Sequence, residues 1–216
     1  LDRPRVMAIL NLTPDSFSDG GAYPTIEAAV QAARNAVAEG AEILDLGGES
    51  TRPGAARVPP EEQIRRVAPV LTAIRGAGPP LDNVAITIDT TSRLVAGAAL
   101  DAGADAINDV SAGTEDPAIL DLAGRRGCGI ILMHRLHAPG ADSYSDRYAT
   151  PPEYTDVVGS VRGFLAQRAA EAMSRGVRRE GIVIDPGLGF GKTVEQNLEL
   201  IRRGREMGSL GFPVLS

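Results

Sequence analysis

Six polar residues each stand at or near the end of a different apolar segment of the chain. These segments are short and rich in Ile, Val, Leu and Ala, as buried β-strands are. A buried strand that ends in an amide or carboxylate presents that group at one edge of a parallel sheet, where reactive sites form. Each buried polar group needs a hydrogen-bond partner, either internal backbone or a heterocyclic ligand rich in N–H groups. The six residues are Asn11, Asp45, Asp89, Asn108, His134 and Asp185.

The first of these segments runs directly into a polar loop. Residues 9–21 read ILNLTPDSFSDGG, apolar at the start and polar after Asn11. Such a segment suits a reactive loop at a strand end, although its two final glycines are equally typical of a solvated turn. The polar residues of this loop are Asn11, Thr13, Asp15, Ser16, Ser18 and Asp19.

The second loop, in residues 42–54, carries Arg52 between two rigid or tight-turning pairs, Gly47-Gly48 and Pro53-Gly54. An arginine held in this way could bind a phosphate or a carboxylate. An exposed loop arginine without a ligand is the alternative.

The loop after Asp185 contains three glycines within residues 182–193. Their spacing excludes the two common nucleotide-binding motifs, because Pro186 and Lys192 stand where the Walker loop and the dinucleotide fingerprint require glycine. The glycines would instead let the backbone approach a flat ligand, or let Phe190 turn over a pocket.

His134 and His137 stand three residues apart at a strand end, without the further His or Cys spacing of a zinc site. We therefore expect them at structural or rim positions. Cys128 is the only cysteine of the sequence, which excludes an internal disulfide, and its apolar neighbours predict a small buried side chain.

Charge and composition limit the kinds of partner. The sequence has 22 Lys and Arg against 28 Asp and Glu, a net charge of −6, which disfavours nucleic acid and anionic membranes as main partners. Four Tyr, four Phe and no Trp offer few platforms for stacking bases. No apolar segment approaches the ~20 residues that span a bilayer, and we expect a cytoplasmic protein.

Strand-like segments alternate with amphipathic helical segments along the chain, which predicts a parallel sheet covered by helices. An open doubly wound sheet uses few strand ends at its ligand site, whereas all strand ends of a barrel converge on one mouth. Because polar residues end six strands, we favour a TIM (β/α)8 barrel, folded as one domain over residues 1–216. The predicted strands are Arg5–Leu12, Glu42–Gly47, Val84–Thr90, Asp105–Ser111, Gly129–His134, Gly181–Pro186 and Phe212–Leu215.

Only seven strands fit the 216 residues, and the seventh ends at the last residue. A barrel of this type usually needs ~250 residues, and an unclosed sheet leaves strand edges unpaired. We therefore expect a C-terminal segment with the last βα units beyond Ser216. Within the chain, capping-box spacing predicts helix starts at Thr150 and Thr193.

Five segments together resemble the dihydropteroate synthase family. In chain order they are ILNLTPDSFSDGG, ILDLGGESTRPGA, ITIDT, INDVSAG and IDPGLGFGKT. One such segment could arise by chance, but five in this order are highly specific. The resemblance implies an α/β barrel that joins 6-hydroxymethyl-7,8-dihydropterin pyrophosphate to p-aminobenzoate, giving 7,8-dihydropteroate and pyrophosphate.

The resemblance also implies residue roles. A carboxylate can accept two adjacent N–H groups of a pterin side by side, and an amide oxygen suits Mg²⁺ held against the pyrophosphate. Pyrophosphate is implied to leave first, so that Asp19 stabilises the remaining pterin cation. The implied groups are Asp89, Asn108, Asp185 and Met133 for the pterin; Phe17, Thr51, Pro53 and Phe190 for p-aminobenzoate; Asp19 and Arg52 for catalysis; and Asn11 for Mg²⁺.

The sequence departs from the family pattern in the fifth loop, where RLHAPGADSY replaces the usual Gly-Thr-Pro after Met133-His134. We expect a different shape for this loop. The family's Ser-Arg-Lys and Arg-x-His groups would fall beyond Ser216, so a chain ending there would bind pterin with little catalysis. The family also implies a homodimer built through C-terminal helices.

Two other functions remain open at this point. A pterin-binding methyltransferase, which passes a methyl group from methyltetrahydrofolate to a corrinoid protein, shares the Asp and Asn positions but has no need for TPDSFSDGG. An inactive pterin-binding paralogue or fragment is the second alternative. Release of pyrophosphate from the two substrates would separate all three.

Overall fold

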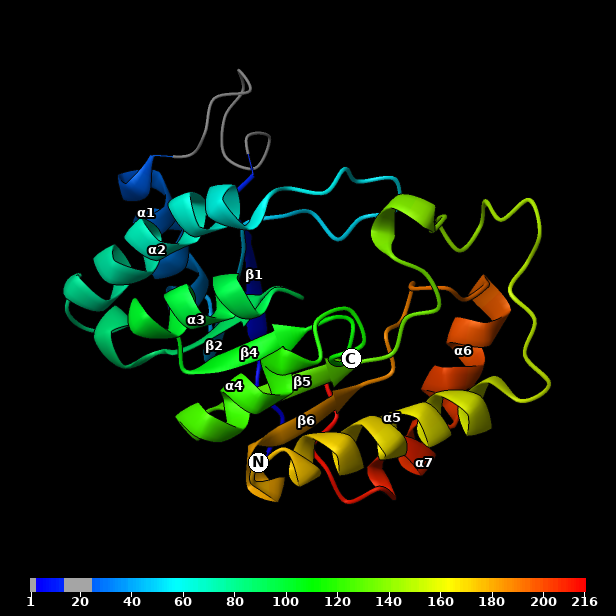
Figure 1. Ribbon diagram of the computed structural model, residues 1–216. Coiled ribbons are helices and arrows are strands. Elements are labelled where there is room, and N and C mark those ends of the chain that lie inside the picture. The colour runs from blue at the N-terminus through cyan, green and yellow to red at the C-terminus, as the bar shows by residue number, and fades with distance from the viewer. Residues whose placement is uncertain (1–2, 14–24) are drawn as a thin grey trace. The chain divides into compact units, whose positions relative to one another are not determined.

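Strands and helices alternate along the chain in the computed structural model, which describes residues 3–13 and 25–216 (Figure 1). The chain forms two units, one of residues 1–50 and 57–108 and the other of residues 51–56 and 109–216. Within the described ranges, no helix combines the length and apolar composition that a bilayer crossing requires.

The first unit is built on four parallel strands that pair in chain order. Their side chains alternate between two faces, as in any β-strand. Leu44, Leu46, Ile86 and Ile88 are fully buried on one face, while the polar residues alternate with them on the other. The strands are β1 (Met7–Asn11), β2 (Ile43–Gly47), β3 (Ala85–Asp89) and β4 (Ala106–Asp109).

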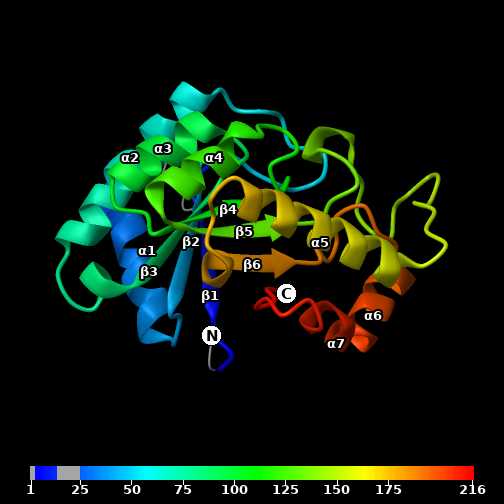
Figure 2. The ribbon, with the colours of Figure 1, turned by 60° about the horizontal axis from the view of Figure 1, so that its bottom comes forward.

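Three helices of the first unit pack side by side, α1 on α2 and α2 on α3 (Figures 1 and 2). Val67, Leu71 and Ile74 form the buried stripe of α2 with no exposed surface, so the burial of apolar side chains stabilises this layer. The elements are α1 (Ile26–Ala38), α2 (Pro60–Gly76), the 3₁₀ turn η1 (Leu81–Asn83) and α3 (Arg93–Asp101).

The second unit contains two parallel strands, and its longest helix packs against both of them (Figure 2). That helix, α5, also contacts α4, α6 and α7. The elements are α4 (Ala118–Arg126), β5 (Gly129–Met133), η2 (Pro139–Ala141), α5 (Val157–Ser174), η3 (Arg179–Gly181), β6 (Ile182–Asp185), α6 (Val194–Arg202) and α7 (Gly204–Gly208).

Six of the seven predicted strands are confirmed, each one to three residues shorter at its ends. The seventh, predicted over 212–215, is wrong as a full strand, because only Val214 forms an isolated parallel bridge to Ile184. The backbone bonds nevertheless follow a parallel register, with Ile184 N donating to Pro213 O at 3.0 Å and Leu215 N to Ile184 O at 2.9 Å.

The two predicted capping boxes have different outcomes. Thr193 caps α6 with both reciprocal bonds of the box, as predicted. The predicted start at Thr150 is wrong, because α5 begins at Val157 after an Asp156 cap. Tertiary bonds hold the intervening segment in another conformation, among them the bond from Gln196 Nε2 to Pro152 O at 2.7 Å.

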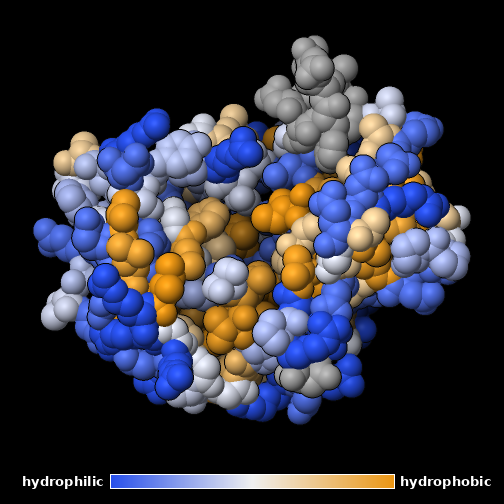
Figure 3. Space-filling model, turned by 180° about the vertical axis from the view of Figure 1, so that it is seen from behind, coloured by the Kyte–Doolittle hydropathy of each residue, from blue (hydrophilic) through white to orange (hydrophobic). Residues whose placement is uncertain are grey.

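Apolar side chains also reach the surface, as the orange groups in Figure 3 show for one face of the molecule. Ile9 of β1 is 68% exposed. It stands in register with Asp45 and therefore on the polar face of its sheet.

Candidate functional site

The carboxyl ends of the four strands of the first unit form one continuous row. Asn11 pairs in register with Gly47, Gly47 with Asp89, and Asp89 with Asn108. Residues in register across parallel strands project from the same face of the sheet. Three sequence-predicted site residues, Asn11, Asp89 and Asn108, thus lie in this strand-end row.

Below the row, the Asp45 carboxylate organises a buried polar network. Thr87 Oγ1 donates a short hydrogen bond to one carboxylate oxygen, and Asn108 Nδ2 donates to the other at 2.9 Å. Burial raises the pKa of Asp45, while the bonds from Thr87 and Asn108 oppose this increase. The network fixes the orientation of the Asn108 amide.

The oxygen of the Asn108 amide, unlike its nitrogen, lacks a hydrogen-bond partner among the described residues. Asn108 is 7% exposed, and within residues 3–13 and 25–216 its Oδ1 atom has no hydrogen-bond partner. A buried acceptor without a donor is unfavourable by about 1–3 kcal/mol. The Asn108 oxygen is therefore an unsatisfied acceptor of the strand-end row.

Gly47 keeps the middle of the row open. A Cβ atom at this position would lie 3.5 Å from Asn11 Oδ1 and 3.6 Å from the Asp89 Cβ. A third neighbour, Glu49 O, would also lie 3.5 Å from this Cβ, so the glycine leaves a methyl-sized space beside the Asn11 amide oxygen. This oxygen is a hard donor of the type that Mg²⁺ prefers.

In the second unit, Met133 and Asp185 end two neighbouring strands in register. Met133 is buried. The backbone N–H of Gly187 donates to Asp185 Oδ1 at 2.7 Å, which orients the carboxylate at the start of the sixth loop, residues 186–193. The two sequence-predicted pterin residues of this unit thus lie side by side.

Replacing Gly187 by alanine is expected to destabilise the protein by several kcal/mol, because its φ of 65° is left-handed and a Cβ would stand 1.9 Å from His134 O. Gly189→Ala is the matched control. Gly189 also has a left-handed φ, 86°, but a Cβ there meets nothing within 4 Å, so only about 1–2 kcal/mol is expected. Urea unfolding measures both, and equal losses would contradict the close contact.

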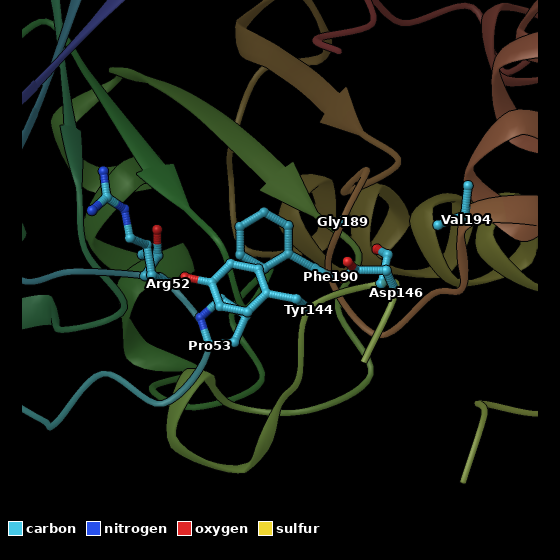
Figure 4. A pocket seen from close by; sticks show the side chains of 9 residues that line it. Arg52, Pro53, Tyr144, Asp146, Gly189, Phe190 and Val194 are labelled. Carbon is cyan, nitrogen blue, oxygen red and sulfur yellow. The ribbon is translucent and has the colours of Figure 1, made fainter. Parts of the chain in front are cut away.

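Three loops of the second unit and the start of α6 line an open cavity of about 530 Å³. Figure 4 shows the rings of Pro53, Tyr144 and Phe190 gathered there, with the Arg52 guanidinium directed away from the two aromatic rings. Four sequence-predicted residues, Thr51, Arg52, Pro53 and Phe190, meet in its lining. The remaining lining residues are Tyr144, Ser145, Asp146, Gly189 and Val194.

The fifth loop, residues 135–156, is fastened to the sixth by hydrogen bonds. Asp142 Oδ2 accepts from Gly191 N at 3.0 Å, and Tyr154 donates its hydroxyl to Gly191 O at 3.0 Å. Pro139 O accepts from Gly54 N at 2.8 Å, which connects the second loop. The cavity walls are therefore held together by backbone groups and by the side chains of Asp142 and Tyr154.

Comparisons with known proteins give the family of this chain. The family described as pterin binding enzyme matches residues 7–216. A dihydropteroate synthase of Synechocystis is 44% identical over 213 residues, covering 99% of this chain and 70% of that protein. The solved structure of Xanthomonas albilineans dihydropteroate synthase with 4-aminobenzoic acid is 42% identical with a TM-score of 0.85, covering 99% of this chain and 72% of that one.

The chain belongs to the dihydropteroate synthase family. This membership makes it a transferase of folate biosynthesis and confirms the predicted TIM-barrel fold class, of which the described strands form part. A probable bifunctional folylpolyglutamate synthase/dihydropteroate synthase of Haloferax volcanii is 46% identical over 99% of this chain, which spans 24% of that longer protein.

Two predicted site residues, Phe17 and Asp19, lie outside the described residues. Three residues of the fifth loop, Tyr144, Ser145 and Asp146, line the cavity but were not predicted, because that loop departs from the family pattern. Lys192 was also missed. It is fully buried, and burial lowers its pKa to about 7, against the opposing charges of Asp185 and Asp142.

The predictions for His134 and Cys128 have different outcomes. His134 occupies a structural position, as predicted: it is 6% exposed, and its ring contacts Phe164 edge-on at 5.0 Å between centroids. Cys128 is half-buried rather than buried, so its predicted burial is only partly correct. Partial burial raises the pKa of the thiol.

Protonation of His134 is expected to destabilise the protein in acid. Burial lowers its pKa from 6.5 to about 3, so only the unfolded chain binds this proton between these two values. The free energy of unfolding should therefore fall as the pH decreases from 6.5 to 3, by up to about 1.4 kcal/mol per pH unit.

Urea titrations across this range test that dependence. His134→Gln should remove its part of the slope, and His137→Gln, at the exposed second histidine, should keep it. An unchanged slope in His134→Gln would contradict the assignment.

Proposed function

We propose that this chain binds both substrates of dihydropteroate synthase and condenses 6-hydroxymethyl-7,8-dihydropterin pyrophosphate with p-aminobenzoate. The observation that carries the proposal is the meeting of Thr51, Arg52, Pro53 and Phe190 in one cavity. A relative with 42% identity is described with 4-aminobenzoic acid. The reaction gives 7,8-dihydropteroate and pyrophosphate.

The pterin-binding roles of Asp89, Asn108, Asp185 and Met133 are proposed from the family resemblance. Asp89 and Asp185 each provide a carboxylate that can accept two adjacent N–H groups of the pterin ring. Asn108 contributes its buried Oδ1 as a third acceptor, held in place by the bond from its Nδ2 to Asp45. Met133, buried beside Asp185, offers an apolar surface to the ring.

p-Aminobenzoate is proposed to bind in the cavity of the second unit. Pro53 and Phe190 supply apolar walls for its ring, and Thr51 lies at the same wall. Arg52 supplies a positive charge suited to the departing pyrophosphate or to a carboxylate. Asp19 and Phe17 are proposed, from the family resemblance alone, to stabilise the pterin cation and to contact the arylamine.

Asn11 is proposed to hold Mg²⁺ through its amide oxygen beside the open position at Gly47. Within the described ranges, no three His, Cys, Asp or Glu side chains gather as a metal site. The single amide oxygen of Asn11 fits Mg²⁺, which often binds through few protein ligands and keeps water and substrate oxygens. When bound, Mg²⁺ would neutralise charge on the leaving pyrophosphate.

Measuring pyrophosphate release by the full-length protein tests the proposed function. With both substrates and Mg²⁺, pyrophosphate and dihydropteroate should form in equal amounts, and omission of p-aminobenzoate should prevent dihydropteroate formation. Binding of the pterin without turnover would indicate a binding paralogue. Methyl transfer from methyltetrahydrofolate to a corrinoid protein, without the condensation, would indicate the methyltransferase alternative.

Two further properties are proposed, a cytoplasmic location, from the lack of a long apolar segment in the sequence, and, from the family resemblance alone, a homodimer formed through C-terminal helices. Light scattering on the full-length protein tests the second. A monomer at micromolar concentration would contradict it.

A further inference from the structure

Lys192 is the only lysine among the 22 basic residues of the sequence, the other 21 being arginine. It is also completely buried. Placing a charged side chain in the interior is unfavourable by several kcal/mol unless it is paired and hydrogen-bonded. All 21 other basic positions carry arginine. The one lysine therefore stands at a buried position, where a charged side chain is hard to accommodate.

Three backbone carbonyl groups surround the Lys192 ammonium. Nζ donates to Phe190 O at 2.7 Å, to Gly187 O at 2.8 Å and to His134 O at 3.3 Å. An ammonium group has three N–H donors, so the cage satisfies all of them. A planar guanidinium is wider and presents its donors in one plane, which explains why arginine does not replace lysine here.

The cage joins two loops. His134 follows β5, whereas Gly187 and Phe190 belong to the sixth loop after β6. Three glycines of the sixth loop have left-handed φ values, 65° at Gly187, 86° at Gly189 and 67° at Gly191. The loop forms a turn bond from Phe190 N to Gly187 O at 3.1 Å, and its Gly189 and Gly191 N–H groups donate to the side chains of Asn197 and Asp142. These bonds hold N–H groups of the loop, whereas the ammonium holds the carbonyl oxygens of Gly187 and Phe190.

The sixth loop carries groups of both proposed binding pockets. Phe190 and Gly189 line the cavity assigned to p-aminobenzoate. At the other end of the loop, Gly187 N donates directly to the Asp185 carboxylate at 2.7 Å, a bond that Lys192 does not itself make. Loss of the ammonium should consequently affect Phe190 more than Asp185.

We propose that Lys192 is a positioning residue whose ammonium fixes the sixth loop and so places Phe190 against the arylamine substrate. It contacts neither substrate itself. This inference rests on the proposed function, because the cavity that Phe190 lines is the one assigned to p-aminobenzoate.

Steady-state kinetics of Lys192→Met and Lys192→Arg in the full-length protein test the proposal. Methionine keeps an unbranched chain of similar length without donors, and arginine keeps the charge. Both should raise the KM for p-aminobenzoate about tenfold or more, because small misplacements of binding groups have effects of this size. The KM for the pterin substrate should change much less, and Arg175→Lys, at an exposed ion pair with Asp121, should change neither.

Chemical rescue separates positioning from general damage. Lys192→Ala lacks the last four heavy atoms of the side chain, which n-propylammonium replaces. Added n-propylammonium should lower the KM for p-aminobenzoate of this variant, whereas tetramethylammonium, which has no N–H donor, should not. If Lys192→Met does not fold, Lys192→Arg and the rescue experiment still test whether the ammonium positions the loop.

Several results would overturn the inference while wild-type activity stands: unchanged kinetics in Lys192→Met and Lys192→Arg, equal increases in both KM values, or no rescue by n-propylammonium. A wild-type protein that releases no pyrophosphate would instead refute the proposed function. The two failures are therefore distinct.

Discussion

Asp185→Asn is expected to reduce pterin affinity about 100-fold or more while the fold remains intact. A carboxylate accepts two neighbouring N–H donors, whereas an amide accepts one and presents its own donor to the other. Charge-assisted hydrogen bonds each contribute about 1.5–3 kcal/mol, and 1.4 kcal/mol corresponds to a tenfold change. Asparagine keeps the size of the side chain and an oxygen for the bond from Gly187 N.

Calorimetric titration with the pterin substrate measures this loss. Asp121→Asn is the matched control, because Asp121 lies on α4 in an exposed ion pair with Arg175 and is remote in sequence from the strand ends. Its pterin affinity should equal that of the wild type. Retained affinity in a folded Asp185→Asn protein would remove Asp185 from the proposed pterin site.

Asn108→Asp is expected to produce the largest loss of stability among the isosteric changes. It replaces a donor that lies 2.9 Å from the Asp45 carboxylate by a second carboxylate, in a buried position. An uncompensated buried charge is unfavourable by about 3–5 kcal/mol, which corresponds to a decrease of roughly 10 °C in Tm for a chain of this length. Thermal unfolding at pH 7 measures the decrease.

Two further measurements, at acid pH and on an exchanged double variant, test whether the loss of stability comes from repulsion between the two carboxylates. Like-charge repulsion and burial raise the folded-state pKa of the carboxyl pair, so the folded variant binds more protons than the unfolded chain as the pH falls towards 4. The loss of stability should therefore shrink in acid. The exchanged pair Asp45→Asn/Asn108→Asp again matches a donor with a carboxylate and should recover most of the lost Tm; no recovery would contradict the network.

The strand ends could be predicted because their signal is local. Apolar alternation identifies each strand, and parallel pairing then brings the ends together. The register of Asn11, Gly47, Asp89 and Asn108 follows from that rule. The hydrogen bond from Asn108 to Asp45 could not be predicted, since it joins side chains 63 residues apart.

Irregular loops carried the features that sequence patterns missed. The predicted helix start at Thr150 had a correct local motif, but bonds from Tyr154 and to Pro152 select another conformation. Lys192 served only to exclude a nucleotide motif. Its burial depends on three carbonyl groups from two loops, one of them on the left-handed Gly187. Its status as the sole lysine was nevertheless a usable signal.

The fifth loop separates the residues that anchor it from those that face the cavity. Asp142 and Tyr154 provide the anchoring bonds to Gly191, while Tyr144 and Asp146 line the cavity. Natural selection can therefore exchange the facing side chains without loosening the loop. Substitutions at the facing positions can then change how strongly the cavity binds an arylamine relative to a drug that resembles it. The stability of the fold should change little, because the anchoring bonds remain.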